Sequence, residues 1–242
     1  MKKMMGMGCV LVLGMAALGL RWQLYQTAVD EKGLFQRMHP LSLALLALTA
    51  AALLVIYFIV RKQTESASFE EGNPRGILTA LGHAVMAGCI LSVVLAGSPR
   101  AIGYLAIAWK WLGFAAPLCL LLAGTARLQG RKSSFLLHVV PCLFLVVHIV
   151  SHYQTWSGNP QMQDYVFALL GAMALMFFGF YTAALEADSG SRRMLLGMGL
   201  AAIYLCLAEV ANSAYPQLYL AGMFWVLTEL RGLDAPAPAE KE

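Results

Sequence analysis

Eight apolar runs, each close to the thickness of a bilayer, constrain the fold of this 242-residue chain more than any other feature. A helix needs about 20 mostly apolar residues to cross the hydrocarbon core of a membrane. Charged residues make up only 12% of the chain, well below the usual fraction in a soluble domain. The sequence therefore predicts an all-α membrane protein, a bundle of about eight transmembrane helices. The runs cover residues 4–24, 41–60, 77–97, 102–124, 134–153, 163–184, 194–213 and 216–233.

The connections between the runs are short, and the longest are 25–40 and 61–76. A soluble domain needs more chain than these connections provide, so we expect one polytopic transmembrane domain over residues 1–233. The segment 234–242 contains two Ala-Pro pairs and charges of both signs. This composition is typical of a short disordered tail, here expected on the cytoplasmic side.

Two tripeptides that each occur twice in the chain indicate an internal repeat. The tripeptide Tyr-Gln-Thr follows the first run at 25–27 and the fifth run at 153–155, and Tyr-Leu-Ala occurs at 104–106 and again at 219–221. Matching positions four runs apart favour two parallel four-helix halves, 1–128 and 129–233, related by an axis along the membrane normal. Chance recurrence of common residues is the alternative.

The cations are concentrated on alternate connections, which predicts the orientation of the chain. Twelve of the 17 Lys and Arg residues lie at the termini and on the even-numbered connections: Lys2, Lys3, Arg61, Lys62, Arg75, Arg127, Arg131, Lys132, Arg192, Arg193, Arg231 and Lys241. The odd-numbered connections carry Arg21, Lys32, Arg37 and Arg100. Because short cytoplasmic loops carry the excess of cations, we expect a multi-pass protein of the cell membrane with both termini in the cytoplasm. This topology explains the net charge of +4, so no nucleic-acid partner is expected.

Ionisable residues inside the runs are the best candidates for a functional site, since each costs about 2.5–3.5 kcal/mol at the membrane centre. Lys110, Glu209 and His148 all fall in the outer halves of their runs. A Lys110–Glu209 pair with His148 beside it could bind a substrate or couple its movement to a proton. The alternative is a structural ion pair that clamps two helices together.

His148 and His152 are four residues apart, so they share one helix face. Two imidazoles could contribute to a metal site, with Glu209 or Asp164 as a third ligand. The pair could instead line a pocket that binds a substrate or couples its movement to a proton, together with Lys110 and Glu209. Solvated side chains at the membrane interface, next to an aromatic belt, are the simpler interpretation. We therefore expect neither a metal nor another cofactor.

Two further groups of ionisable residues lie near the cytoplasmic helix ends. His83 and His138 have matching depths, as a bis-imidazole haem site would require, but buried histidines more often hydrogen-bond within the protein. Glu186 and Glu229 lie close to Asp188 and Arg231. We expect these two glutamates to be solvated.

Aromatic residues at the outer ends of the runs could form a binding vestibule, with Trp22, Tyr25, Tyr153 and Trp156 as its candidate lining. Belt residues that only anchor the helices at the interface would have the same pattern. The segment 30–35 could lie along the interface as a lid over this vestibule.

Three functional hypotheses follow. A small-solute or ion transporter, permease-like and with its polar site in the outer half, fits a chain that is almost entirely membrane. A sensor or an accessory subunit would bind a partner subunit in the bilayer. An intramembrane metal-dependent hydrolase comes third. An enzyme is the least expected, because the chain lacks HExxH, GxSxG, Walker and GxGxxG motifs.

Overall fold

Eight helices make up the bundle in the computed structural model, which describes residues 2–28, 39–61, 76–97, 103–156, 165–211 and 213–232. The described chain is all-helical, as predicted. The helices are α1 Lys2–Thr27, α2 Pro40–Arg61, α3 Gly76–Leu95, α4 Tyr104–Leu128, α5 Leu136–Trp156, α6 Val166–Glu186, α7 Arg192–Val210 and α8 Pro216–Gly232.

Seven of these helices are long and apolar enough to cross a membrane, judged over the described residues. The eighth, α8, has 17 residues. Large apolar side chains such as Leu46, Leu54 and Phe58 are exposed on the outer surface of the bundle. Hydrocarbon solvates such side chains without the cost they would have in water, so a membrane-spanning bundle accounts for them.

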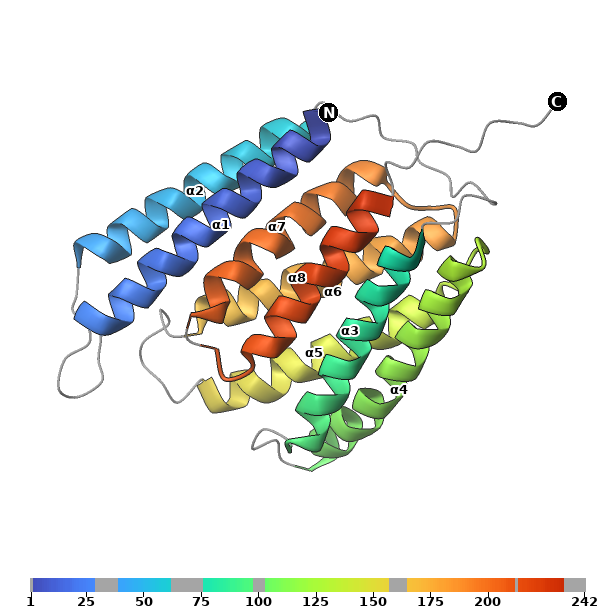
Figure 1. The fold of residues 1–242 in the computed structure, drawn as a ribbon. Helices are drawn as coiled ribbons and strands as arrows, with labels where there is room; N and C mark the ends of the chain where they lie inside the picture. The colour runs from blue at the N-terminus through green and yellow to red at the C-terminus, as the bar shows by residue number, and fades with distance from the viewer. Residues whose placement is uncertain are drawn as a thin grey trace.

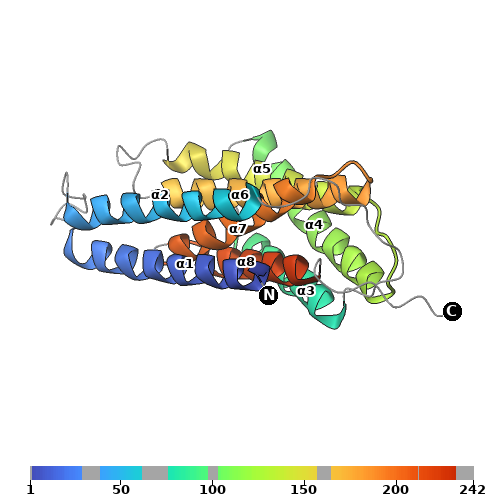
Figure 2. The same cartoon turned by 90° about the horizontal axis from the view of Figure 1, so that it is seen from above.

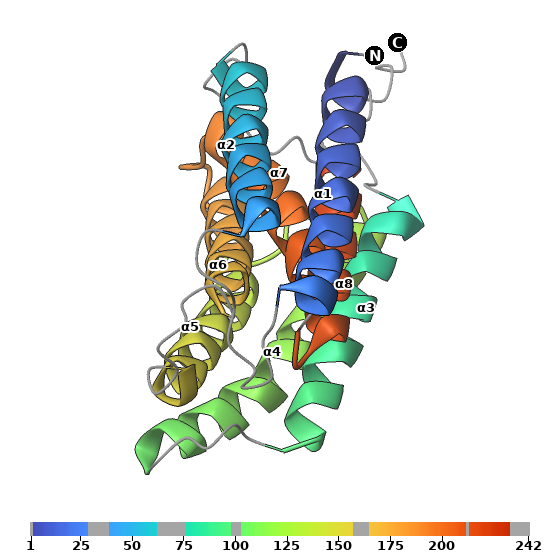
Figure 3. The ribbon, with the colours of Figure 1, turned by 90° about the vertical axis from the view of Figure 1, so that its left-hand side faces the viewer.

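Six helices form a closed ring. Each helix from α3 to α8 contacts the next one along the chain, and α8 returns to contact α3 (Figure 1). The α1–α2 pair lies outside this ring and packs against it mainly through α7, which is seen between α1 and α2 in Figure 3. Figure 2 shows α1 and α2 running side by side, with α4 on the far side of the molecule.

The helices alternate in direction, so the bundle has two distinct ends. The end where α1 begins and where the even-numbered helices finish is called the amino-terminal face below. The other end is called the opposite face. The predicted halves, 1–128 and 129–233, are not packed alike, because α6 contacts α7 whereas α2 and α3 have no contact within the described residues. The repeat itself stays a prediction.

The ring encloses a packed core in which aromatic side chains meet helices brought close by glycine. Trp225 and Phe178 lie edge to face with ring centroids 5.3 Å apart. At the α3–α8 contact, a Cβ atom built on Gly82 would lie 2.0 Å from Oγ1 of Thr228. Small residues allow this close approach of membrane helices, so α3 and α8 are held at a spacing that a side chain at position 82 would prevent.

Replacing Gly82 by Ala is expected to lower the free energy of unfolding by about 1–3 kcal/mol, because the new methyl group overlaps Thr228. Thermal unfolding in detergent would measure the loss. Gly88→Ala on the same helix is the matched control, since no atom lies within 4 Å of a Cβ built there. Equal stability of the two variants would contradict the packing described for α3 and α8.

Candidate functional site

A buried ion pair between Arg21 and Glu209 lies near the opposite face. Nη1 of Arg21 donates to Oε2 of Glu209 at 2.5 Å and to the carbonyl oxygen of Ala208 at 3.0 Å. The exposed fractions of Arg21 and Glu209 are 1% and 2%. The pair therefore joins α1 to α7 inside the bundle.

Two aromatic rings complete the surroundings of Arg21. The guanidinium carbon lies 4.8 Å from the ring centroid of Phe167 on α6, a favourable cation–π distance. Nη2 donates to the hydroxyl of Tyr25 at 3.3 Å. The sequence had placed Arg21 on the connection after the first run. That placement is wrong, because α1 continues to Thr27 and turns Arg21 toward α7.

A pocket of about 320 Å³ opens beside Arg21 between α1, α2 and α6. Leu46, one of the side chains that line it, is 67% exposed on the surface of α2. The backbones of α2 and α6 do not approach each other within the described residues, so the pocket fills the space between these two helices. Its lining consists of Arg21, Leu24, Ser42, Leu43, Leu45, Leu46, Thr49, Val166, Phe167 and Leu170.

The pocket lining carries few polar groups besides Arg21. Oγ of Ser42 is buried and has no hydrogen-bond partner among the described residues. Oγ1 of Thr49 donates to the carbonyl oxygen of Leu45 at 2.8 Å and lies 2.9 Å from the hydroxyl of Tyr204. A ligand in this pocket would therefore meet apolar walls, one guanidinium and one available hydroxyl.

Lys110 does not belong to this site. It is exposed on α4, and the backbones of α4 and α7 do not approach each other within the described residues. The predicted Lys110–Glu209 pair is wrong, because Arg21 occupies the position beside the carboxylate. Depth along a run placed Glu209 in the outer half but did not reveal which neighbouring helix it faces.

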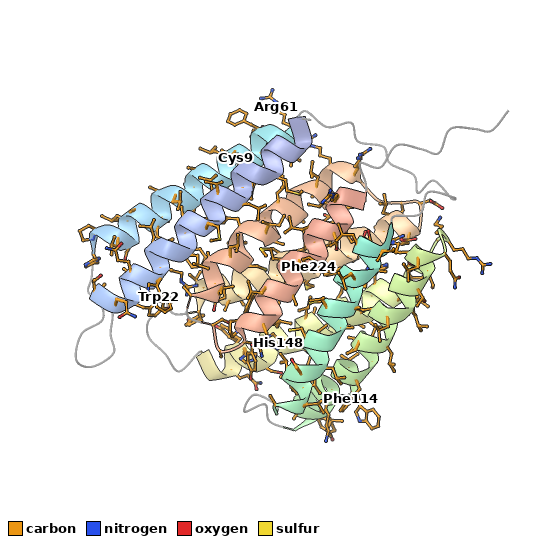
Figure 4. All side chains as sticks on the ribbon, viewed as in Figure 1. Cys9, Trp22, Arg61, Phe114, His148 and Phe224 are labelled. Atoms are coloured by element: carbon orange, nitrogen blue, oxygen red, sulfur yellow. The ribbon has the colours of Figure 1, made fainter. Side chains whose placement is uncertain are left out.

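His148 and His152 form a separate aromatic cluster with Tyr215 (Figure 4 labels His148). Their ring centroids lie 4.3 Å apart, and the ring of Tyr215 lies 5.2 Å from that of His152. Both imidazoles are buried, so the interpretation as solvated interface residues is wrong. Glu209 is paired with Arg21, Asp164 lies outside the described residues, and no group of three metal-ligating side chains is found in the described ranges.

The predicted vestibule is not assembled around one site. Trp22 is 59% exposed on α1 and Tyr153 is exposed on α5, and the backbones of these two helices do not approach each other within the described residues. Tyr25 reaches the Arg21 site through its hydroxyl. The side chain of Trp156 and the predicted lid at 30–35 lie outside the described residues.

A second buried ionic cluster lies near the amino-terminal face, and it was not predicted as one. Arg127 pairs with Glu186 through Nη1 and Oε1, and its Nε lies 3.5 Å from Oε1 of Glu229. Nε2 of His83 lies 3.3 Å from that same oxygen. Both glutamates are buried, so the expectation that they are solvated is wrong. The available sequence signal was an Arg and two Glu at similar positions near the ends of three even-numbered runs.

His138 and Ser133 extend this cluster to α5. Nε2 of His138 lies 3.3 Å from Oγ of Ser133, whose backbone N–H donates to Oε2 of Glu186 at 3.2 Å. The rings of His83 and His138 meet edge to face with centroids 5.7 Å apart. These two histidines therefore make hydrogen bonds and ring contacts within the protein, the alternative to the haem site considered from the sequence.

Replacing Arg127 by Met is expected to lower the free energy of unfolding by about 3–5 kcal/mol, since two buried carboxylates would lose their shared cation. Adding Glu186→Gln should restore part of the lost free energy of unfolding, because it removes one of those carboxylates. Thermal unfolding of both variants in the same detergent tests this. A double variant no more stable than Arg127→Met would contradict the assignment.

Two ionic clusters thus lie inside the bundle, near opposite ends of the helices. One joins α1 to α7 beside the pocket between α1, α2 and α6. The other joins α3, α4, α6 and α8. No protein-family model matches this chain, and neither a curated protein nor a solved structure matches it.

Proposed function

We propose that this multi-pass membrane protein is a permease-like component that takes up an amphipathic anion at the pocket beside Arg21. The observation that supports the proposal is a largely apolar pocket with a buried guanidinium in its lining. Of the four site residues expected from the sequence, Glu209 alone belongs to this proposed site. The pocket lining contains neither Lys110 nor the His148–His152 pair.

The chemistry of the pocket favours a ligand with one acidic group and one apolar tail. A guanidinium binds carboxylate, sulfonate or phosphate oxygens with charge-assisted hydrogen bonds. Apolar walls favour a hydrocarbon chain, at about 0.8 kcal/mol for each buried methylene group. The unpartnered hydroxyl of Ser42 supplies a further donor for the acidic group.

Competition for Arg21 links the anion to a proton. Arg21 is paired with the buried carboxylate of Glu209, so an added anion would compete with that carboxylate for the guanidinium. Protonation of Glu209 removes the competing charge and favours binding of the anion to Arg21. We therefore expect one proton to enter with each anion, and the affinity for the anion to rise as the pH falls.

The orientation proposed from the sequence agrees with this scheme. Arg61, Lys132, Arg192 and Arg231 lie at or beside helix ends on the amino-terminal face. Short cytoplasmic segments carry such cations, which supports a cytoplasmic amino-terminal face in the cell membrane. The Arg21 pocket then lies in the outer half of the bundle.

An accessory-subunit role is the second candidate. Helix α2 contacts α1 and α7 and otherwise presents exposed leucine and aromatic side chains within the described residues. Such a face could pack against a transmembrane helix of a partner subunit. Contact with lipid explains the exposure of these side chains equally well, so this exposure does not favour a partner subunit. The pocket beside Arg21 is an observation that only the permease-like function uses.

Leu46→Trp should weaken the binding of radiolabelled dodecanesulfonate about tenfold or more, because the indole would occupy the pocket mouth while Arg21 is unchanged. The measurement is equilibrium binding to protein in phosphatidylcholine nanodiscs. Leu53→Trp is the matched control, since Leu53 is exposed on the same helix but does not line the pocket. Equal binding by both variants, or equal affinity for dodecanol, would overturn the proposal.

Glu209→Gln should remove the pH dependence of dodecanesulfonate binding, because the amide is neutral at every pH. The wild-type protein should bind more tightly as the pH falls, and the variant should bind at neutral pH as tightly as the wild type does in acid. A sulfonate stays ionised throughout, so the ligand adds no titration of its own. Glu229→Gln, at the other cluster, is the control and should keep the wild-type pH dependence. A Glu209→Gln variant with unchanged pH dependence would exclude the proposed coupling.

A further inference from the structure

Three buried polar atoms near the opposite face have no hydrogen-bond partner within the part of the chain that the structure describes. They are Nε1 of Trp109 on α4 and, on α5, Nδ1 of His148 and Oγ of Ser151. The exposed fractions of these three side chains are 1%, 2% and 0%. None of them lines the pocket beside Arg21, so the proposed anion site does not account for them.

The three residues lie at similar depths on two neighbouring helices. Helices α4 and α5 pack against each other. At the opposite face α4 begins at Tyr104 and α5 ends at Trp156, so Trp109 and Ser151 each lie five residues in from that end. His148, labelled in Figure 4, precedes Ser151 by three residues and therefore lies beside it on the surface of α5.

The phenyl group of Phe144 connects the two helices at this level. Its centroid lies 6.1 Å from the ring centroid of Trp109 and 5.9 Å from that of His148. Phe144, His148 and Ser151 follow one another at spacings of four and three residues, so they share one face of α5. All three are buried. The indole, the imidazole and the hydroxyl thus form one site inside the six-helix ring, called the interior site below and defined as Trp109, His148 and Ser151.

Unpaired polar atoms at this depth would be costly, because each one loses its hydrogen bonds to water when the chain folds. Contacts between N–H groups and aromatic rings are too weak to replace those bonds. Proteins satisfy such atoms with buried water, which typically makes about three hydrogen bonds to polar groups that lack another partner. The interior site supplies three atoms of this kind.

The chemistry of the interior site selects a small neutral ligand that both donates and accepts hydrogen bonds. The indole N–H of Trp109 can only donate, so it cannot coordinate a cation. No member of the site carries a permanent positive charge that would hold an anion. Nδ1 of His148 donates in one tautomer and accepts in the other, and the hydroxyl of Ser151 can do both. A water molecule matches these atoms in either tautomer.

We infer that the interior site binds water, and that this water bridges α4 to α5 inside the six-helix ring. The water accepts a hydrogen bond from the indole of Trp109 and exchanges hydrogen bonds with His148 and Ser151. Phe144 lies one helical turn further from the opposite face than His148. Its phenyl group therefore separates the bound water from the middle of the bundle.

Water-edited solid-state NMR of the full-length protein in phosphatidylcholine liposomes tests the inference. The chain has five tryptophans, and Trp109→Phe would assign the indole signal. We expect the indole N–H of Trp109 to receive magnetisation from water although the side chain is buried. The double variant His148→Phe, Ser151→Ala should lose about two thirds or more of this transfer, because the water would lose two of its three partners.

Thr182→Val is the matched control for the double variant. It also removes a buried hydroxyl, but that hydroxyl donates to the carbonyl oxygen of Phe178 on its own helix at 2.9 Å. The Trp109 signal should be unchanged in this control. A wild-type Trp109 that receives no magnetisation from water would overturn the inference. Equally strong transfer in the double variant would do so too, because water would then reach the indole without the interior site.

Thermal unfolding of Ser151→Ala in detergent provides a second test. With water bound, the substitution removes one hydrogen bond, and the melting temperature should fall by about 2–4 °C in a chain of this size. In a dry site the same substitution would remove an unpaired buried hydroxyl and raise the melting temperature. A melting temperature that rises or stays the same would contradict the bridging water.

Discussion

Every ionised side chain inside this bundle has to be neutralised by other protein groups, because the surrounding hydrocarbon offers no water. Arg21 and Glu209 satisfy this requirement across α1 and α7. Arg127 satisfies it for two carboxylates on α6 and α8. Non-polar contacts between helices differ little in free energy from contacts with lipid. These ion pairs therefore specify which helices are neighbours. The arrangement of the bundle therefore depends on them.

The two ionic clusters lie in different parts of the bundle. The first, the Arg21–Glu209 pair, lies where α1 packs against the ring of helices, beside the pocket between α1, α2 and α6. The second lies inside the closed ring, where α3 meets α8.

Part of the candidate site could be predicted from the sequence. A glutamate in the outer half of an apolar run is costly, and this cost correctly marked Glu209 as a residue that needs a partner. The partner was wrong, because Arg21 had been assigned to the connection after the first run, and because depth says nothing about the direction in which a side chain points. Glu186 and Glu229 were misjudged for a related reason. Closeness to a helix end suggests contact with water, but neighbouring helices cover both carboxylates.

The sequence by itself determined that the chain is an all-helical, multi-pass bundle, because run length and hydropathy depend on local composition alone. It also placed Lys110, His148 and Glu209 within the helices rather than on the connections. Only the tertiary structure decided that six helices close into a ring, that α1 and α2 contact it through α7, and that Arg21 rather than Lys110 faces Glu209. The physical reason is that helix pairing depends on close packing at residues such as Gly82 and on charge pairs between distant segments. Neither leaves a periodic signal in a single chain.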